Sequence, residues 1–244
     1  MIRLLKYDWK RNATALLGSG AVLIIVQLML EVFATNPEFR IVMSIMAYSA
    51  AAVLIVVMAC KTYAQNIVSY SRHLLPVRTS FHVLSPILLA LICSIILGII
   101  IILHLMLTRQ FIDHQRYVEL VQVHAYSLIW AGVLILWVFM TQIITIFLAI
   151  TISRSFRVKA RAWIGLIAYF GIAYVMSFLE HVLQLEPLGW ADEIIRTNEK
   201  SNTQVIDLNM KGLQGFYSTL AFEFIIACLM FFIIVRLLKR RVES

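Results

Sequence analysis

Six apolar stretches, each nearly free of charge, constrain this chain more than any other feature of its sequence. A helix rises 1.5 Å per residue, so about 20 apolar residues cross roughly 30 Å of bilayer hydrocarbon. Of the 244 residues, 61% are hydrophobic and 14% charged, whereas soluble domains are about half apolar and a quarter charged. These values argue against a soluble domain. They predict an all-α integral membrane protein with six spans, at about residues 13–33, 41–60, 83–107, 127–152, 163–179 and 218–238.

The first twelve residues differ from the spans because apolar and basic side chains alternate in them. Such a pattern predicts an amino-terminal helix at residues 1–12 that lies in the headgroup region, followed by a six-span domain at residues 13–244. The apolar run after it is longer than the 7–15 residues of a signal-peptide core, so we interpret it as a retained span.

Lys and Arg are distributed unevenly among the connections between spans. Six spans place both termini on one side, and the positive-inside rule places the Lys- and Arg-rich side in the cytoplasm. Fifteen of the 21 basic residues then lie inside with two acidic residues, and six lie outside with eleven. The resulting charges, +13 inside and −5 outside, account for the net +8. We therefore expect cytoplasmic termini and no nucleic-acid partner.

Two of the connections suggest a role. The loop at residues 61–82 is the largest cytoplasmic feature, and Pro76 ends any helix that begins near Ala64. We predict that this loop docks a partner. The outer segment at residues 180–217 contains Pro187 and mixed charge, and we expect it to form short helices or a re-entrant piece that caps the fold or gates an exit.

The sequence lacks the motifs of nucleotide-binding and hydrolytic sites, since neither GxxxxGK[ST] nor HExxH occurs. Cys60, Cys93 and Cys228 form no CxxC or Cys/His cluster, and we expect them to be buried, inert thiols. We therefore predict that this chain is not an enzyme and has no catalytic residue, metal site or cofactor of its own.

Ionisable residues are scarce inside the predicted spans. Glu31 and Glu223 lie near outer ends, and Arg236 can reach the inner surface. His104 is the remaining ionisable group at depth, and a hydrogen-bonded or interfacial histidine is favoured over a proton relay. This scarcity argues against a proton- or sodium-coupled transporter and against an intramembrane hydrolase.

Small and aromatic residues are concentrated in the second and fifth spans, where they permit close helix packing. Either they form ordinary intramembrane packing, or they line a translocation path or a dimer interface. The candidates for the second role are Ser44, Tyr48, Ala51, Tyr169, Phe170 and Tyr174.

The loop between the second and third spans ends in LLPVRTSFHVLSPILLALI. Together with an interfacial amino-terminal helix and six spans, this segment resembles the permease subunit of ATP-binding-cassette (ABC) exporters of the type 2 permease superfamily. In that family a Leu-Pro-Val/Ile-Ser/Arg stretch follows the coupling helix, which contacts the ATPase. The small size is similar to that of Gram-positive exporters of antimicrobial or amphipathic peptides such as phenol-soluble modulins. The coupling residues implied by the resemblance are Gln65, Tyr70, Ser71, Arg72, His73, Leu74 and Leu75.

The resemblance implies a type V ABC exporter fold and a subunit of a bacterial cell membrane transporter. Its partners would be ABC ATPase subunits that bind ATP and Mg²⁺, a second permease copy in a homo- or heterodimer, membrane lipid, and an apolar or amphipathic substrate such as a peptide, toxin or lipid-like molecule. Two alternatives stay open: a non-transport membrane assembly or sensor subunit, and a secondary transporter.

Overall fold

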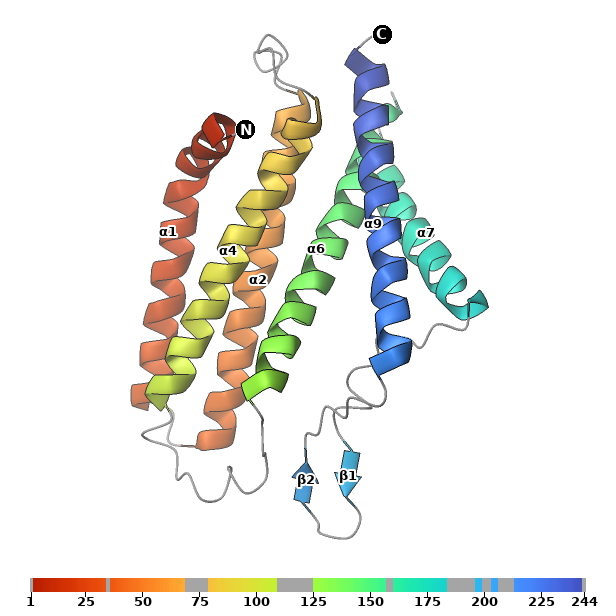
Figure 1. Ribbon diagram of the computed structural model, residues 1–244. Coiled ribbons are helices and arrows are strands. Elements are labelled where there is room, and N and C mark those ends of the chain that lie inside the picture. The colour runs from red at the N-terminus through yellow and green to blue at the C-terminus, as the bar shows by residue number, and fades with distance from the viewer. Residues whose placement is uncertain are drawn as a thin grey trace. The chain divides into compact units, whose positions relative to one another are not determined.

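A computed structural model describes residues 2–33, 36–68, 79–108, 125–156, 160–183, 196–198, 203–205 and 213–242. Each of the six predicted spans lies within one helix, which confirms the helical fold (Figure 1). The chain forms two compact units, Met1–Ile112 and Asp113–Ser244. The elements in chain order are helices α1 (Ile2–Phe33), α2 (Pro37–Val68), α4 (Thr79–Thr108), α6 (Ala125–Ser155) and α7 (Arg161–Val182), strands β1 (Arg196–Asn198) and β2 (Thr203–Val205), and helix α9 (Leu213–Val242).

The first unit contains α1, α2 and α4, and each of these helices packs against the other two. Consecutive helices run in opposite directions, so the start of α1, the end of α2 and the start of α4 lie at the same end of the unit (Figure 1). Small residues let helices approach closely in a membrane. Ala59 on α2 and Ala90 on α4 have this role, and both are almost fully buried.

In the second unit, α6 packs against both α7 and α9. The buried apolar side chains of α6 include Ile143 and Phe147, and those of α9 include Met230 and Ile234. Strands β1 and β2 are antiparallel, with Arg196 opposite Val205.

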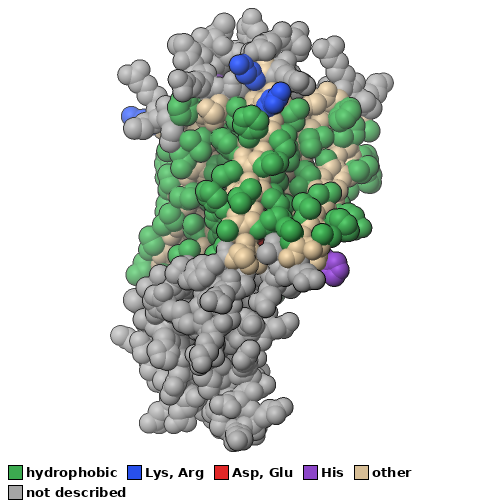
Figure 2. All heavy atoms as spheres, turned by 45° about the vertical axis from the view of Figure 1, so that its right-hand side comes forward, with side chains coloured by type: hydrophobic (Ala, Val, Ile, Leu, Met, Phe, Trp, Pro, Cys, Tyr) green, Lys and Arg blue, Asp and Glu red, His purple; other side chains and the backbone are tan. Residues whose placement is uncertain are grey.

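The six helices of the described residues are all long and apolar enough to cross a membrane. On the face shown in Figure 2, hydrophobic side chains cover the described helices, and the Lys and Arg side chains lie at one end. Large apolar side chains such as Leu17, Ile167 and Phe232 are more than 60% exposed, which is unfavourable in water and favourable in lipid. The chain is therefore a multi-pass membrane protein. By length and composition, the stretches able to span are Leu4–Phe33, Phe39–Ile67, Ser80–His104, Gly132–Ser155, Ala162–Val182 and Ser218–Lys239.

The ends of the first unit's helices differ from the sequence-based boundaries. Helix α1 runs without a break from Ile2, so residues 1–12 do not form a separate helix, and their place at the membrane surface stays a prediction. Helix α2 continues to Val68 and α4 begins at Thr79, so residues 61–68 and 79–82 of the predicted loop are helical, and residues 69–78 lie outside the described residues. The added turns of α2 are stabilised by hydrogen bonds that join Thr62 and Asn66 to α1.

The described residues of the outer segment at 180–217 belong to the last turn of α7, the strand pair β1 and β2, and the first turn of α9. Residues 184–195, 199–202 and 206–212 lie outside the described residues, so the expected short helices or re-entrant piece stay a prediction.

Candidate functional site

A buried carboxylate joins the three helices of the first unit at one end. Asp8 on α1 is fully buried, and its Oδ2 atom accepts hydrogen bonds from Ser85 Oγ on α4 at 2.7 Å and from Asn66 Nδ2 on α2 at 3.3 Å. Arg11 Nη2 lies 3.6 Å from Asp8 Oδ1, so a neighbouring charge compensates the carboxylate. Hydrogen bonds to a charged acceptor are about twice as strong as neutral ones. We name Asp8, Asn12, Thr62, Asn66 and Ser85 the Asp8 cluster.

Helical spacing brings the members of this cluster together. Asp8 and Asn12 are four residues apart on α1, and Thr62 and Asn66 are four residues apart on α2, so each pair lies on one helix face. Asn12 Nδ2 donates to Thr62 Oγ1 at 2.9 Å, which adds a second polar contact between α1 and α2. Since Thr62, Asn66 and Ser85 are also almost fully buried, the cluster is shielded from solvent.

A second carboxylate joins the same three helices at the other end of the unit. Glu31 on α1 forms an ion pair with Arg40 on α2, with Nη1 and Oε2 3.0 Å apart. Its other oxygen, Oε1, lies 3.2 Å from Nε2 of His104 on α4. The prediction that His104 is hydrogen-bonded is therefore confirmed. We name Gln27, Glu31, Arg40, Ser44, Tyr48 and His104 the Glu31 cluster.

Two members of the Glu31 cluster retain unused hydrogen-bonding capacity. Ser44 Oγ donates to Gln27 Oε1 at 3.0 Å, while Gln27 Nε2 has no partner among the described residues. The Tyr48 hydroxyl is also buried without such a partner, and its ring packs edge-on against His104 with the ring centroids 5.8 Å apart. Buried polar groups usually find a partner, so these groups are suited to bind water or a polar ligand atom.

The second unit has a smaller polar site. Trp137 Nε1 on α6 donates to Glu223 Oε2 on α9 at 2.6 Å, and the Trp137 ring stacks on Phe224. Tyr169 on α7 donates its hydroxyl hydrogen to Gln142 Oε1 on α6 at 3.0 Å. Each bond therefore joins α6 to one of its two neighbours, and Glu223 has a partner at its depth in the span.

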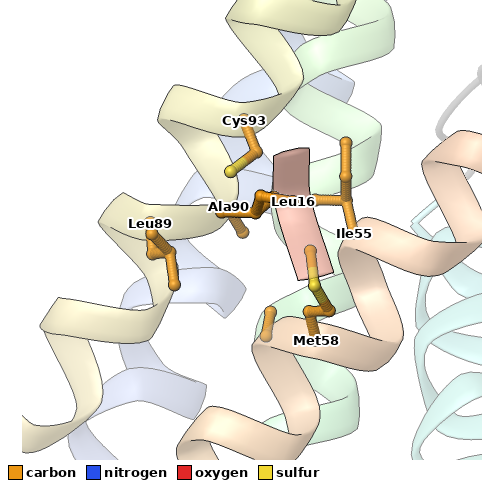
Figure 3. A pocket seen from close by; sticks show the side chains of 7 residues that line it. Leu16, Ile55, Met58, Leu89, Ala90 and Cys93 are labelled. Carbon is orange, nitrogen blue, oxygen red and sulfur yellow. The ribbon is translucent and has the colours of Figure 1, made fainter. Parts of the chain in front are cut away.

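A small apolar cavity lies between α1, α2 and α4 (Figure 3). Its volume is about 10 Å³, and the side chains of Ile55, Met58, Leu89 and Cys93 point toward it. A water molecule needs two or more polar partners in a cavity of at least this size. An apolar void of this volume is therefore dry packing space rather than a substrate pocket. Its lining residues are Leu16, Ile55, Met58, Ala59, Leu89, Ala90 and Cys93.

The candidate path or interface residues fall in both units. On α2, Ser44 and Tyr48 belong to the Glu31 cluster, and Ala51 lies one turn further along the helix. On α7, Tyr169 contacts Phe170 edge-on and bonds to α6, while Phe170 and Tyr174 are exposed. Their role as a path or interface stays a prediction.

Of the predicted coupling residues, Gln65 lies in the last turns of α2 with its side chain exposed. The others, Tyr70, Ser71, Arg72, His73, Leu74 and Leu75, lie outside the described residues.

The Asp8 cluster was not anticipated from the sequence. There Asp8 is a single acidic residue within a segment rich in Lys and Arg, and nothing marks it as buried. The i, i+4 polar pairs at Asp8 and Thr62 are the signal that points to it. That signal gives a polar face on each helix, but it does not indicate which faces meet.

The described part of the chain contains no group of three or more His, Cys, Asp or Glu residues placed to hold a metal ion. Comparisons of the chain with protein-family models, with curated proteins and with solved structures found no match. The functional argument therefore depends on the residues themselves.

Proposed function

We propose that this chain is the membrane-spanning permease subunit of an ABC exporter with the type V exporter fold and both termini in the cytoplasm. Separate ATPase subunits would hydrolyse ATP, a second permease copy would complete the transporter, and an apolar or amphipathic molecule would be the cargo. The observation that carries the proposal is the LLPVR motif at residues 74–78, between α2 and α4, because in the family that the chain resembles such a stretch follows the coupling helix.

The geometry of the first unit supports this role. The segment at residues 69–78 joins the end of α2 to the start of α4, and both of these helix ends are bonded to Asp8. A force applied to the segment would therefore act on a bonded group of three helices. Coupling requires that the segment contact the two nucleotide states of the ATPase differently, because only a difference in contact free energy shifts a conformational equilibrium.

Copurification tests the proposal directly. We expect the affinity-tagged chain, extracted from its native membrane in mild detergent, to bring down in fixed stoichiometry a soluble subunit that has a phosphate-binding loop. Substitutions Ser71→Ala, Arg72→Glu and Leu75→Ala should change the ATPase rate of that complex. Ser94→Ala, which removes a hydroxyl bonded within α4 to the Ala90 carbonyl oxygen at 2.7 Å, should not.

Two results would contradict the proposal. Purification without any ATPase subunit would favour the assembly or sensor alternative. Transport driven by a proton gradient without ATP would favour a secondary transporter, for which the contact between Glu31 and His104 supplies titratable groups.

A further inference from the structure

The Asp8 carboxylate is bonded to the two helices that lead into and out of the segment at residues 69–78. Asn66 lies in the last turn of α2, before that segment, and Ser85 lies in the second turn of α4, after it. Both side chains donate to the same oxygen atom, Asp8 Oδ2. A displacement of either helix end therefore changes a hydrogen bond to α1.

Helix α4 has a built-in weak point next to this contact. Pro86 follows Ser85 inside the helix and cannot donate a backbone hydrogen bond to the preceding turn. Such a position is a usual site of helix bending. The turn at residues 79–85 is thus less firmly attached to the rest of α4, and the bond from Ser85 to Asp8 attaches it to α1 instead.

The burial of Asp8 decides how this end of the unit responds to force. Asp8 is 0% exposed, so no water can replace a protein partner that its carboxylate loses, and a buried charge left without that partner is costly. Asn12 adds a bond between α1 and α2 one turn away. Movement of α1 together with the other two helix ends therefore costs less than separation of the ends.

We propose that Asp8 is a positioning residue that transmits movement of the 69–78 segment to α1, with Ser85 and Asn66 as the contacts that receive the movement. The inference rests on the proposed function, because the ATPase supplies that movement. It adds that α1 moves with the nucleotide state of the ATPase. The family resemblance of the 69–78 segment does not specify such a movement of α1.

Fluorescent labels on both sides of the contact test this proposal in the assembled transporter. The native Cys60, Cys93 and Cys228 are replaced by Ala, and a bimane probe is attached at Lys10→Cys on α1 or at Lys61→Cys on α2, both exposed positions. In the otherwise unaltered complex, ATP with vanadate should change the emission at both positions.

The variants separate transmission from binding. With Asp8→Ala or Ser85→Ala, the response at position 61 should persist, while the response at position 10 should fall by about fivefold or more, as expected when a coupling contact is lost. Ser94→Ala is the matched control because the Ser94 hydroxyl, among the described residues, bonds within its own helix α4, to the Ala90 carbonyl oxygen at 2.7 Å. It should leave both responses unchanged. General destabilisation would alter both positions rather than one.

A full response at position 10 in the Asp8→Ala and Ser85→Ala complexes would overturn the inference and leave the proposed function intact. No nucleotide response at either position of the otherwise unaltered complex, or no ATPase in it, would overturn the proposed function. If Asp8→Ala yields no folded complex, Ser85→Ala decides alone, since it removes one hydroxyl group and one bond to the carboxylate.

Discussion

Asp8 and Glu31 are the two acidic residues of α1, and each carboxylate contacts both other helices of its unit. They lie near opposite ends of α1, so polar contacts connect the three helices at both ends of the unit. Lipid supplies little hydrophobic driving force between helices, and packing and polar contacts must hold them together. Two charged residues that look incidental in the sequence are therefore central to this unit.

The ion pair at the Glu31 end gives a prediction at the scale of single residues. Arg40→Gln should lower the free energy of unfolding by about 1–3 kcal/mol, because a half-buried carboxylate loses its charged donor. Thermal unfolding in detergent, followed by circular dichroism, measures the change. Lys61→Gln on the same helix removes an exposed cation and should have little effect.

The double variant Glu31→Gln/Arg40→Gln completes a cycle that isolates the pair. Its stability loss should be smaller than the sum of the two single losses. Strict additivity would mean that the 3.0 Å contact contributes nothing to stability.

At the scale of elements, the close approach of α6 and α7 depends on one glycine. A Cβ atom at Gly165 would lie 3.3 Å from Ser153 Cβ, whereas nothing lies within 4 Å of a Cβ atom at Gly171 on the same helix. The two glycines look equivalent in the sequence. Helix packing distinguishes them, because only one faces α6 closely.

Substitution of the two glycines checks this difference. Gly171→Ala should stabilise the protein by about 0.5–1 kcal/mol, because alanine has a higher helix propensity than glycine. Gly165→Val should destabilise it by roughly 1–3 kcal/mol through overpacking against Ser153. Both effects are measured by thermal unfolding of three variants, Gly165→Val, Gly171→Val and Gly171→Ala. Similar losses of stability in the two valine variants would contradict the close contact of Gly165 with α6.

At the scale of the whole molecule, the described residues form six helices able to span a membrane, and the uneven charge of the connections predicts which side of the membrane each connection faces. The exposed residue Asn36, between α1 and α2, should face outward. The exposed Lys10, near the start of α1, should face the cytoplasm. Both assignments follow from the Lys and Arg distribution.

Cysteine labelling in intact cells tests this orientation. In a chain without native cysteines, Asn36→Cys should react with a membrane-impermeant maleimide, and Lys10→Cys should react only after permeabilisation. Lys10→Cys in permeabilised cells is the control for reactivity at that site. The reverse pattern would invert the topology and place the 69–78 segment outside the cytoplasm.

The sequence by itself determined the six membrane-crossing helices, because the free energy of placing a segment in lipid depends mainly on the residues of that segment. It also identified His104 as an ionisable residue at depth and placed Glu31 near an outer end. It did not determine where α2 and α4 end, because the added turns of α2 are stabilised by hydrogen bonds that join Thr62 and Asn66 to another helix, α1.

Only the tertiary structure decided which polar side chains meet. Asp8 bonds to partners 58 and 77 residues away, and this choice depends on the rotation and relative height of three helices. Hydropathy along the chain carries no information about either quantity. Packing of side chains between helices sets both, so the Asp8 cluster became visible only when α1, α2 and α4 were assembled.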